Sequence, residues 1–141
     1  MVNMIKFPYN VRSVARLDSN NTVHNHIYHE CPIGKVDENN IIYNKNNYPI
    51  GRVDKNGVIH DHPLLVSPIG KVEENGFVCK DGLNIAKMDG DNILAAGGAY
   101  LLLIHELRLY NKLSSQLREL LYIYLMYWFT KLIIIVLNSP L

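Results

Sequence analysis

The hydrophobic pattern of residues 14–93 consists of short apolar runs separated by polar turns, and these runs repeat. Aligning the chain on Ile-Gly-Lys/Arg-Val finds three clear copies, at 33–36, 50–53 and 69–72, and two degenerate copies, at 14–17 and 85–88. The copies start 16 to 19 residues apart. A unit of this length is too short for a strand–helix–strand crossover, but it suits two short strands and two turns. The repeat therefore predicts a series of β-hairpins.

The residues that follow each copy indicate where the hairpins turn. An acidic residue comes first and is followed by Asn-Gly or by a weaker asparagine pair; these pairs are Asn56-Gly57, Asn75-Gly76, Asn20-Asn21 and Asn39-Asn40. Asn-Gly favours the type I′ turn, because both central residues of that turn need positive φ. We expect turns at 19–22, 38–41, 54–57, 73–76 and 89–92.

Five such hairpins must share one core, because strands of about four residues are not stable alone. Closing them into a ring removes the exposed edges of an open sheet, and residues 4–14 are available as the closing strand. Gly34, Gly51 and Gly70 each share a strand face with the valine two residues later. On an inward face they would be structural glycines that let a narrow ring close. The predicted fold class is mainly β, with five pseudo-repeated hairpins closed into a small shallow barrel and an α-helical C-terminal tail.

At the level of these motifs the chain resembles the β-flower proteins, specifically the five-fold type. The resemblance covers residues 14–104 and rests on the repeated Ile-Gly-Lys/Arg-Val, the Asn-Gly turns and the segment "AAGGAYLLLI" after the last copy. It implies a shallow barrel of hairpins around a pseudo-symmetric centre, closed by that apolar segment. It implies no activity, and the extension from His105 onward departs from the compact pattern.

The composition of the chain argues against several classes of protein. The chain has 141 residues, with 14 basic and 13 acidic side chains and a net charge of +1, so a nucleic-acid partner is not expected. Two cysteines are too few for a disulfide framework, and the N-terminal residues do not have the pattern of a secretory signal. We expect a repeat domain at 1–93, a closing apolar segment at 94–106, and a helical tail at 107–141.

A ring of charge is the first candidate site. The third position of every copy is basic (Arg16, Lys35, Arg52, Lys71 and Lys87), and the residue two positions later is acidic (Asp18, Asp37, Asp54, Glu73 and Asp89). Five converging cations could bind an anion such as a lipid headgroup or a phosphate. The alternative, which the matched numbers favour, is a ladder of solvated pairs between each cation and a nearby acid.

The second candidate is the segment "HNHIYHEC", in which His24, His26, His29 and Cys31 could ligate zinc, nickel or copper. Their spacing matches no structural zinc pattern, so a polar exposed hairpin is the favoured interpretation. The chain has no phosphate-binding loop and no nucleophile elbow. We therefore expect no enzymatic activity and no cofactor.

The last third of the chain changes its period. Residues 94–104 are an apolar run that suits a core plug or an interfacial segment, and residues 105–120 follow the pattern of an amphipathic helix. Residues 120–137 are 18 residues with one charge, Lys131. Such a run must be covered by a membrane or by an oligomeric helical bundle, and a strand over "LIIIVL" is a weaker possibility.

These features predict a non-enzymatic membrane-associated binding or scaffold module. Basic residues lie before the 120–137 run and none follows it, which places the repeat domain on the cytoplasmic side with only "NSPL" crossing. The alternative is a soluble structural protein that forms a homo-oligomer through its hydrophobic C-terminal helix. A metal-binding protein that uses the histidine-rich hairpin is a weaker alternative.

Overall fold

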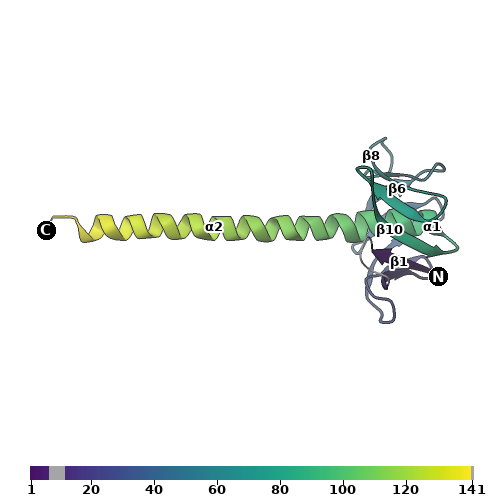
Figure 1. The fold of residues 1–141 in the computed structure, drawn as a ribbon, viewed down its shortest axis with the longest axis horizontal. Coiled ribbons are helices and arrows are strands. Elements are labelled where there is room, and N and C mark those ends of the chain that lie inside the picture. The colour runs from purple at the N-terminus through teal and green to yellow at the C-terminus, as the bar shows by residue number, and fades with distance from the viewer. Residues whose placement is uncertain (7–11, 141) are drawn as a thin grey trace. The chain divides into compact units, whose positions relative to one another are not determined.

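The computed structural model describes residues 1–6 and 12–140. They form two compact units that meet in the sequence between Glu106 and Leu107. The first unit holds all the strands and two helical segments, and the second is the greater part of one long helix, α2 (Glu106–Leu137) (Figure 1).

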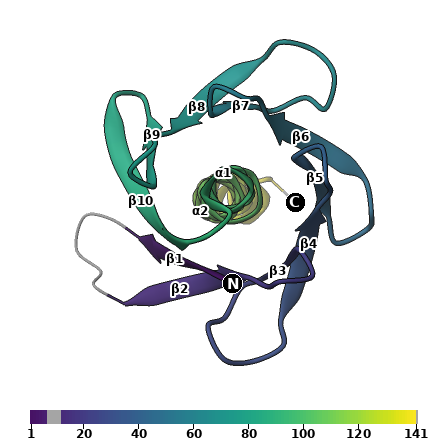
Figure 2. The ribbon, with the colours of Figure 1, turned by 90° about the vertical axis from the view of Figure 1, so that its right-hand side faces the viewer.

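The first unit is a closed antiparallel barrel, as predicted (Figure 2). Its strands are β1 (Val2–Lys6), β2 (Ser13–Leu17), β3 (Thr22–His24), β4 (Pro32–Val36), β5 (Ile41–Asn44), β6 (Pro49–Val53), β7 (Val58–His60), β8 (Pro68–Val72), β9 (Phe77–Lys80) and β10 (Leu83–Gly90). Each strand pairs with the next one along the chain, and β1 pairs with β10. The mainly β fold with a helical tail is therefore confirmed.

The turns β2–β3, β4–β5, β6–β7 and β8–β9 occur where the repeats predict them, within one residue, but their type differs from the prediction. In the β6–β7 turn the N–H of Gly57 donates to the carbonyl of Asp54 (3.1 Å), and Gly57 alone has positive φ, at 84°. This is a type I turn followed by a left-handed bulge residue, not a type I′ turn. The Asp54 carboxylate explains the difference, because it accepts the N–H groups of Asn56 (2.9 Å) and Val58 (3.0 Å) and so favours the type I geometry.

The prediction of a fifth hairpin turn at 89–92 is wrong. β10 continues to Gly90 and pairs along its C-terminal half with β1, from Val2 opposite Gly90 to Lys6 opposite Ala86. The N-terminal segment thus supplies the second strand of the fifth hairpin, and the chain leaves β10 to form a helix. The predicted role of the N-terminus in closing the ring is confirmed for β1, while residues 7–11 lie outside the described residues.

The interior of the barrel is filled by α1 (Ile93–Ala99) and the π-helix η1 (Tyr100–His105), which follows it directly (Figure 2). The segment 94–104 is therefore the core plug of the barrel. Its small residues suit this place, since a Cβ atom added at Gly98 would overlap Val53 of β6. Ala95, Ala96 and Ala99 are fully buried against the inward side chains of the strands.

The three repeat glycines face three consecutive leucines of η1. The distances from a Cβ atom built on each glycine to the nearest leucine methyl carbon are 2.6 Å for Gly34 and Leu103, 2.5 Å for Gly51 and Leu102, and 2.7 Å for Gly70 and Leu101. The glycines therefore make room for the central helix, whereas the sequence predicted that they let a narrow ring close.

The π-helical geometry of η1 matches the five-fold repeat. A helix that offers one residue to each repeat must turn by a fifth of a circle per residue. An α-helix turns farther, by about 100° per residue, whereas a π-helix, with its i→i+5 hydrogen bonds, turns less. Because of this smaller turn, the leucines at 101, 102 and 103 reach β8, β6 and β4 in order.

The second unit is helical throughout its described length to Leu137, so the predicted amphipathic helix, the predicted apolar helix and the segment "LIIIVL" form one continuous element. None of the residues of α2 is buried. Its helical state excludes the alternative of a C-terminal strand.

Candidate functional site

The five basic residues of the repeats lie on the outer face of the barrel wall. They alternate along the strands with small or apolar residues that face the core, and α1 and η1 occupy the interior. The five cations therefore do not converge on the barrel axis. The predicted anion site made by all five has no geometric basis in this structure.

Each of these cations has a partner close by. Lys35 and Lys87 lie over the rings of Tyr43 and Phe77, at 5.3 and 5.4 Å from the centroids. Lys71 pairs with Glu73 at 3.9 Å, and Arg52 donates to the carbonyl of Leu65 at 3.2 Å. The arrangement is that of separate local contacts, among which the predicted pairing with acids holds for Lys71 and Arg16.

Arg16 is the most enclosed of the five, with 6% of its surface exposed. Its Nε donates to Asp18 Oδ1 (2.7 Å), and its Nη1 donates to the carbonyls of His26 (2.7 Å) and His29 (2.8 Å). The guanidinium thus holds the β3–β4 loop against the wall. This is a structural role, and it commits three of the five guanidinium N–H donors to groups of the barrel itself.

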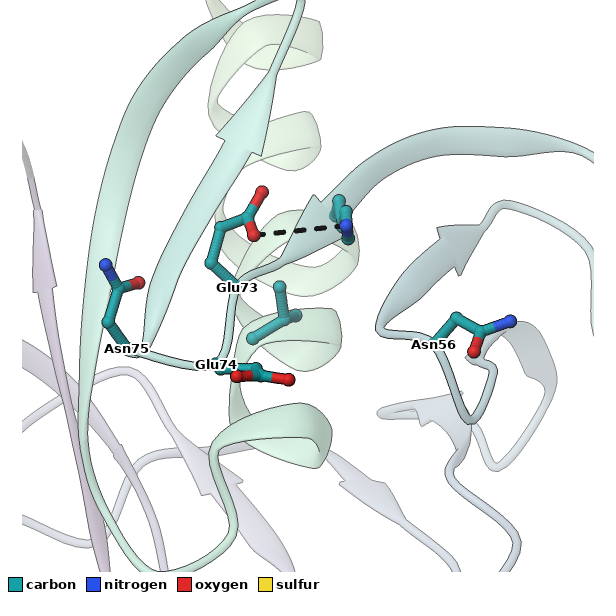
Figure 3. A pocket seen from close by; sticks show the side chains of 6 residues that line it. Asn56, Glu73, Glu74 and Asn75 are labelled. Atoms are coloured by element: carbon teal, nitrogen blue, oxygen red, sulfur yellow. Dashed lines mark ion pairs between the residues drawn. The ribbon is translucent and has the colours of Figure 1, made fainter.

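A hollow lies between the β6–β7 and β8–β9 turns (Figure 3). It is lined by Asn56, Lys71, Val72, Glu73, Glu74 and Asn75. Two carboxylates outnumber the single ammonium, which is already paired with Glu73. An anion such as a phosphate is therefore disfavoured at this hollow.

An unpredicted feature is that the acid of each of the first three repeats bonds the side chain six residues later. Asp18 contacts His24 (2.8 Å), Tyr43 donates to Asp37 (3.1 Å) and His60 contacts Asp54 (3.2 Å). In the fourth repeat the corresponding Cys79 instead donates to Asn84 (2.8 Å). The spacing is present in the sequence as Asp-x5-His/Tyr, but the turn motif alone does not predict it, because the two residues meet only once the hairpin has formed.

The two histidines are held in one tautomer by their neighbours. His24 Nδ1 accepts the N–H of Cys31, and His60 Nδ1 accepts the N–H of Ser67, both at 3.0 Å. The proton of each neutral ring therefore lies on Nε2 and is donated to the aspartate. Both imidazoles are nearly completely buried. Together the bonds fasten the far ends of the β3–β4 and β7–β8 loops to the wall.

The two aspartates are stabilised in their charged form. Burial raises the pKa of Asp18, but the hydrogen bond and charge of Arg16 and the hydrogen bond from His24 outweigh burial, so the pKa lies below the ordinary 3.8. Burial likewise raises the pKa of Asp54, and the bonds from His60 and from the N–H groups of Val58 and Asn56 lower it below the same value. Both carboxylates are therefore anionic acceptors at neutral pH.

The predicted metal ligands do not come together. No three of His24, His26, His29 and Cys31 bring their ligand atoms within 4.8 Å of one another; Asp18, His24 and Glu30 do. A metal-ligating histidine normally donates its other ring N–H, whereas Nδ1 of His24 accepts one. Arg16 also lies against Asp18. These residues do not fit a zinc, nickel or copper ion.

Asp54, His60 and Ser67 have the composition of a catalytic triad without its geometry. The backbone N–H of Ser67 donates to the His60 imidazole, while the Ser67 hydroxyl donates to Asp61. No nucleophilic oxygen is thus aimed at the ring, and the three residues serve to close the β7–β8 loop.

α2 presents the largest apolar surface among the described residues. An 18-residue window of the continuous helix Ile93–Leu137 is long and apolar enough to cross a membrane, and none of that window is buried. Lys131, the single charge within residues 120–137, lies over the rings of Tyr127 (4.8 Å) and Trp128 (5.9 Å). The candidate functional surface is therefore this helix.

No family model, curated protein or solved structure matches this chain.

Proposed function

We propose that this chain is a non-enzymatic membrane-anchored module, in which residues 120–137 cross the bilayer and the barrel serves as a binding or scaffold surface. The observation that carries the proposal is the exposure of α2, in which no side chain is buried. The barrel has a complete core of its own, filled by α1 and η1. An apolar surface this large is far beyond the few hundred Å² that soluble monomers leave uncovered.

The length of the run suits a bilayer. Eighteen helical residues extend about 27 Å, close to the roughly 30 Å of a hydrocarbon core. Tyr122 and Tyr124 lie near its start, where amphipathic rings are favoured close to the headgroups. The hydroxyl of Thr130 donates to the carbonyls of Met126 (3.1 Å) and Tyr127 (2.8 Å), so it adds no unpaired polar group.

The charge asymmetry supports a cytoplasmic barrel. Arg108, Lys112 and Arg118 precede the run, and residues 132–141 contain no basic residue. Basic residues near a span favour the cytoplasmic side.

The titratable groups of the barrel support a binding role more than a catalytic one. The buried histidines and their aspartates are occupied in fastening loops, and the repeat cations have their own partners. We propose that the fold is of the β-flower type, and the repeated motif and the ring of hairpins around an apolar segment support this proposal.

An alternative function is a soluble structural protein that oligomerises through α2. One observation favours it: apolar residues recur at alternating spacings of three and four, as in a coiled coil, at 110, 113, 117, 120, 124 and 127. Two and a half heptads are short for a stable bundle, and they leave the segment 128–137 uncovered.

Cell fractionation separates the two functions. If the run spans a bilayer, the expressed full chain pellets with membranes and resists extraction by alkaline carbonate. A carbonate-soluble chain that elutes as a defined oligomer without detergent would contradict the membrane proposal and support the alternative.

Cysteine labelling tests the orientation. With a cysteine in place of Ser139, an impermeant maleimide added to intact cells should label the chain there, while Cys31 in the parent chain stays protected until lysis, although it is exposed on the barrel. Labelling of Cys31 in intact cells would place the barrel on the outside and overturn the cytoplasmic orientation.

A further inference from the structure

Lys131 is the only charge in residues 120–137. It lies six residues before Leu137, or about 9 Å along the helix axis from that end. In a bilayer this depth lies well inside the hydrocarbon core, where a charged lysine opposes insertion. A charge kept at such a depth calls for a partner.

The Lys131 side chain does not point toward the nearer membrane surface, so its ammonium does not reach water there. Helical side chains tilt toward the N-terminus, and Lys131 Nζ accordingly lies over the rings of Tyr127 and Trp128, one turn earlier. In the proposed span that direction leads toward the bilayer centre and away from the nearer surface at Leu137. The two rings stabilise the ammonium, but they do not neutralise it.

These residues form a distinct face of the helix. Tyr124 and Trp128 stack edge to face, with centroids 6.1 Å apart, and together with Tyr127 and Lys131 they make a patch with three kinds of hydrogen-bond donor. All four are exposed. The opposite side of the helix, with Met126, Phe129 and Ile133, offers only apolar contact and suits lipid.

We propose that the face formed by Tyr124, Tyr127, Trp128 and Lys131 binds a second membrane helix that carries one Asp or Glu at the depth of Lys131. A carboxylate there would neutralise the ammonium and accept charge-assisted hydrogen bonds from the donors around it. A second copy of this chain does not fit, because it would bring a second lysine to the contact and no acid within the span. The inference rests on the proposed membrane span.

The test uses the full chain in phosphatidylcholine vesicles with synthetic Leu/Ala spanning peptides that bear a dansyl group. Two peptides differ only at the position level with Lys131, which holds Glu or Leu. Because Trp128 is the single tryptophan, energy transfer from it to dansyl reports association without labelling the chain. We expect saturable transfer to the Glu peptide at about tenfold lower peptide concentration than to the Leu peptide.

Two variants sharpen the result. K131L should abolish the preference for the Glu peptide, and K131R, which keeps the charge, should retain it. Equal transfer to both peptides by the parent chain, or a preference that survives K131L, would overturn the proposal. A chemically crosslinked dimer that forms without peptide and is lost in K131L would assign the face to a second copy and overturn it too.

Brominated lipids make the two possible failures distinguishable. Quenching of Trp128 by bromine in the acyl chains reports that the run is inserted. Without quenching, the membrane span itself fails. With quenching but no preference for the Glu peptide, only the partner-binding proposal fails.

Discussion

At several positions of this barrel, the atoms packed around a residue restrict which residue type can stand there. Gly51 illustrates this, because a Cβ atom there would meet both the carbonyl of His60 on the neighbouring strand and Leu102 of the central helix. Asp54 is equally constrained, since it accepts two backbone N–H groups of its own turn and contacts the His60 side chain. The repeat therefore retains these residue types for geometric reasons.

Replacing Gly51 with valine should destabilise the barrel by about 1–3 kcal/mol, because the added atoms overpack a filled interior. Urea unfolding of residues 1–119, followed by circular dichroism, measures the change. The matched control is Lys71→Val, at an exposed position of the same repeat motif, which should alter stability by less than about 0.5 kcal/mol. Equal stability of the Gly51 variant and the parent would show that the glycine does not border the central helix.

Acid should weaken the barrel through Asp18 and Asp54. Their pKa values are lower in the folded barrel than the ordinary 3.8, so the unfolded chain binds more protons below that pH. The stability that they contribute is present above about pH 4 and is lost as the pH falls through the folded values. Unfolding free energies measured between pH 2 and 7 should show this decline.

Asp54→Asn isolates one of these groups. The variant should be less stable than the parent at pH 7 by about 1 kcal/mol, since a neutral amide accepts weaker hydrogen bonds. It should also lose less stability on acidification. Glu74→Gln, at an exposed acid in the β8–β9 turn, is the control and should follow the parent. Parallel curves for Asp54→Asn and the parent would contradict the assigned role.

At the scale of elements, the repeat pattern was enough to predict the hairpins, the closed ring and the helical tail. The alternation of Gly and Val with charged residues fixes which face turns inward, and the asparagines fix the turns to within a residue. The fifth hairpin could not be predicted from its own copy, because its second strand comes from the far end of the chain. The π-helix could not be predicted from the sequence either, because its geometry follows from the five-fold spacing of the barrel wall and not from the helix propensities of Tyr100–His105.

The site was less predictable than the fold. The side-chain pairs at Asp18 and Asp54 depend on a spacing of six residues across a turn, which becomes a contact only when the hairpin forms. The repeated cations suggested a converging ring, but each lies between two inward-facing residues of its strand and therefore on the outer face of the wall. The role of the C-terminal tail was easier to predict, because the hydrophobicity of residues 120–137 alone indicates a surface that a membrane or a partner must cover.

The packing of η1 gives a prediction at this scale. Leu101 is fully buried and faces Gly70, so Leu101→Ala should lower the unfolding free energy of residues 1–119 by about 2–5 kcal/mol. Leu113→Ala, on the exposed surface of α2, removes the same atoms and should change it by less than about 0.5 kcal/mol. Similar losses in the two variants would mean that the leucines of η1 are not the centre of the barrel core.

At the scale of the whole molecule, the chain combines a barrel that completes its own core with a helix that has none. Residues up to Ile104 supply the buried side chains of the barrel, and α2 contributes no buried residue. The barrel should therefore fold without residues 120–141, and the helix should determine where the chain resides. The two properties can be separated by a single truncation.

The most direct measurement compares the full chain with a chain that ends at Glu119, by membrane fractionation and far-UV circular dichroism. We expect the full chain in the carbonate-resistant membrane fraction and the shortened chain in solution, with its β spectrum intact. A full chain that is soluble without detergent, together with a shortened chain that is unfolded, would make the helix a core element and contradict the membrane-anchored account.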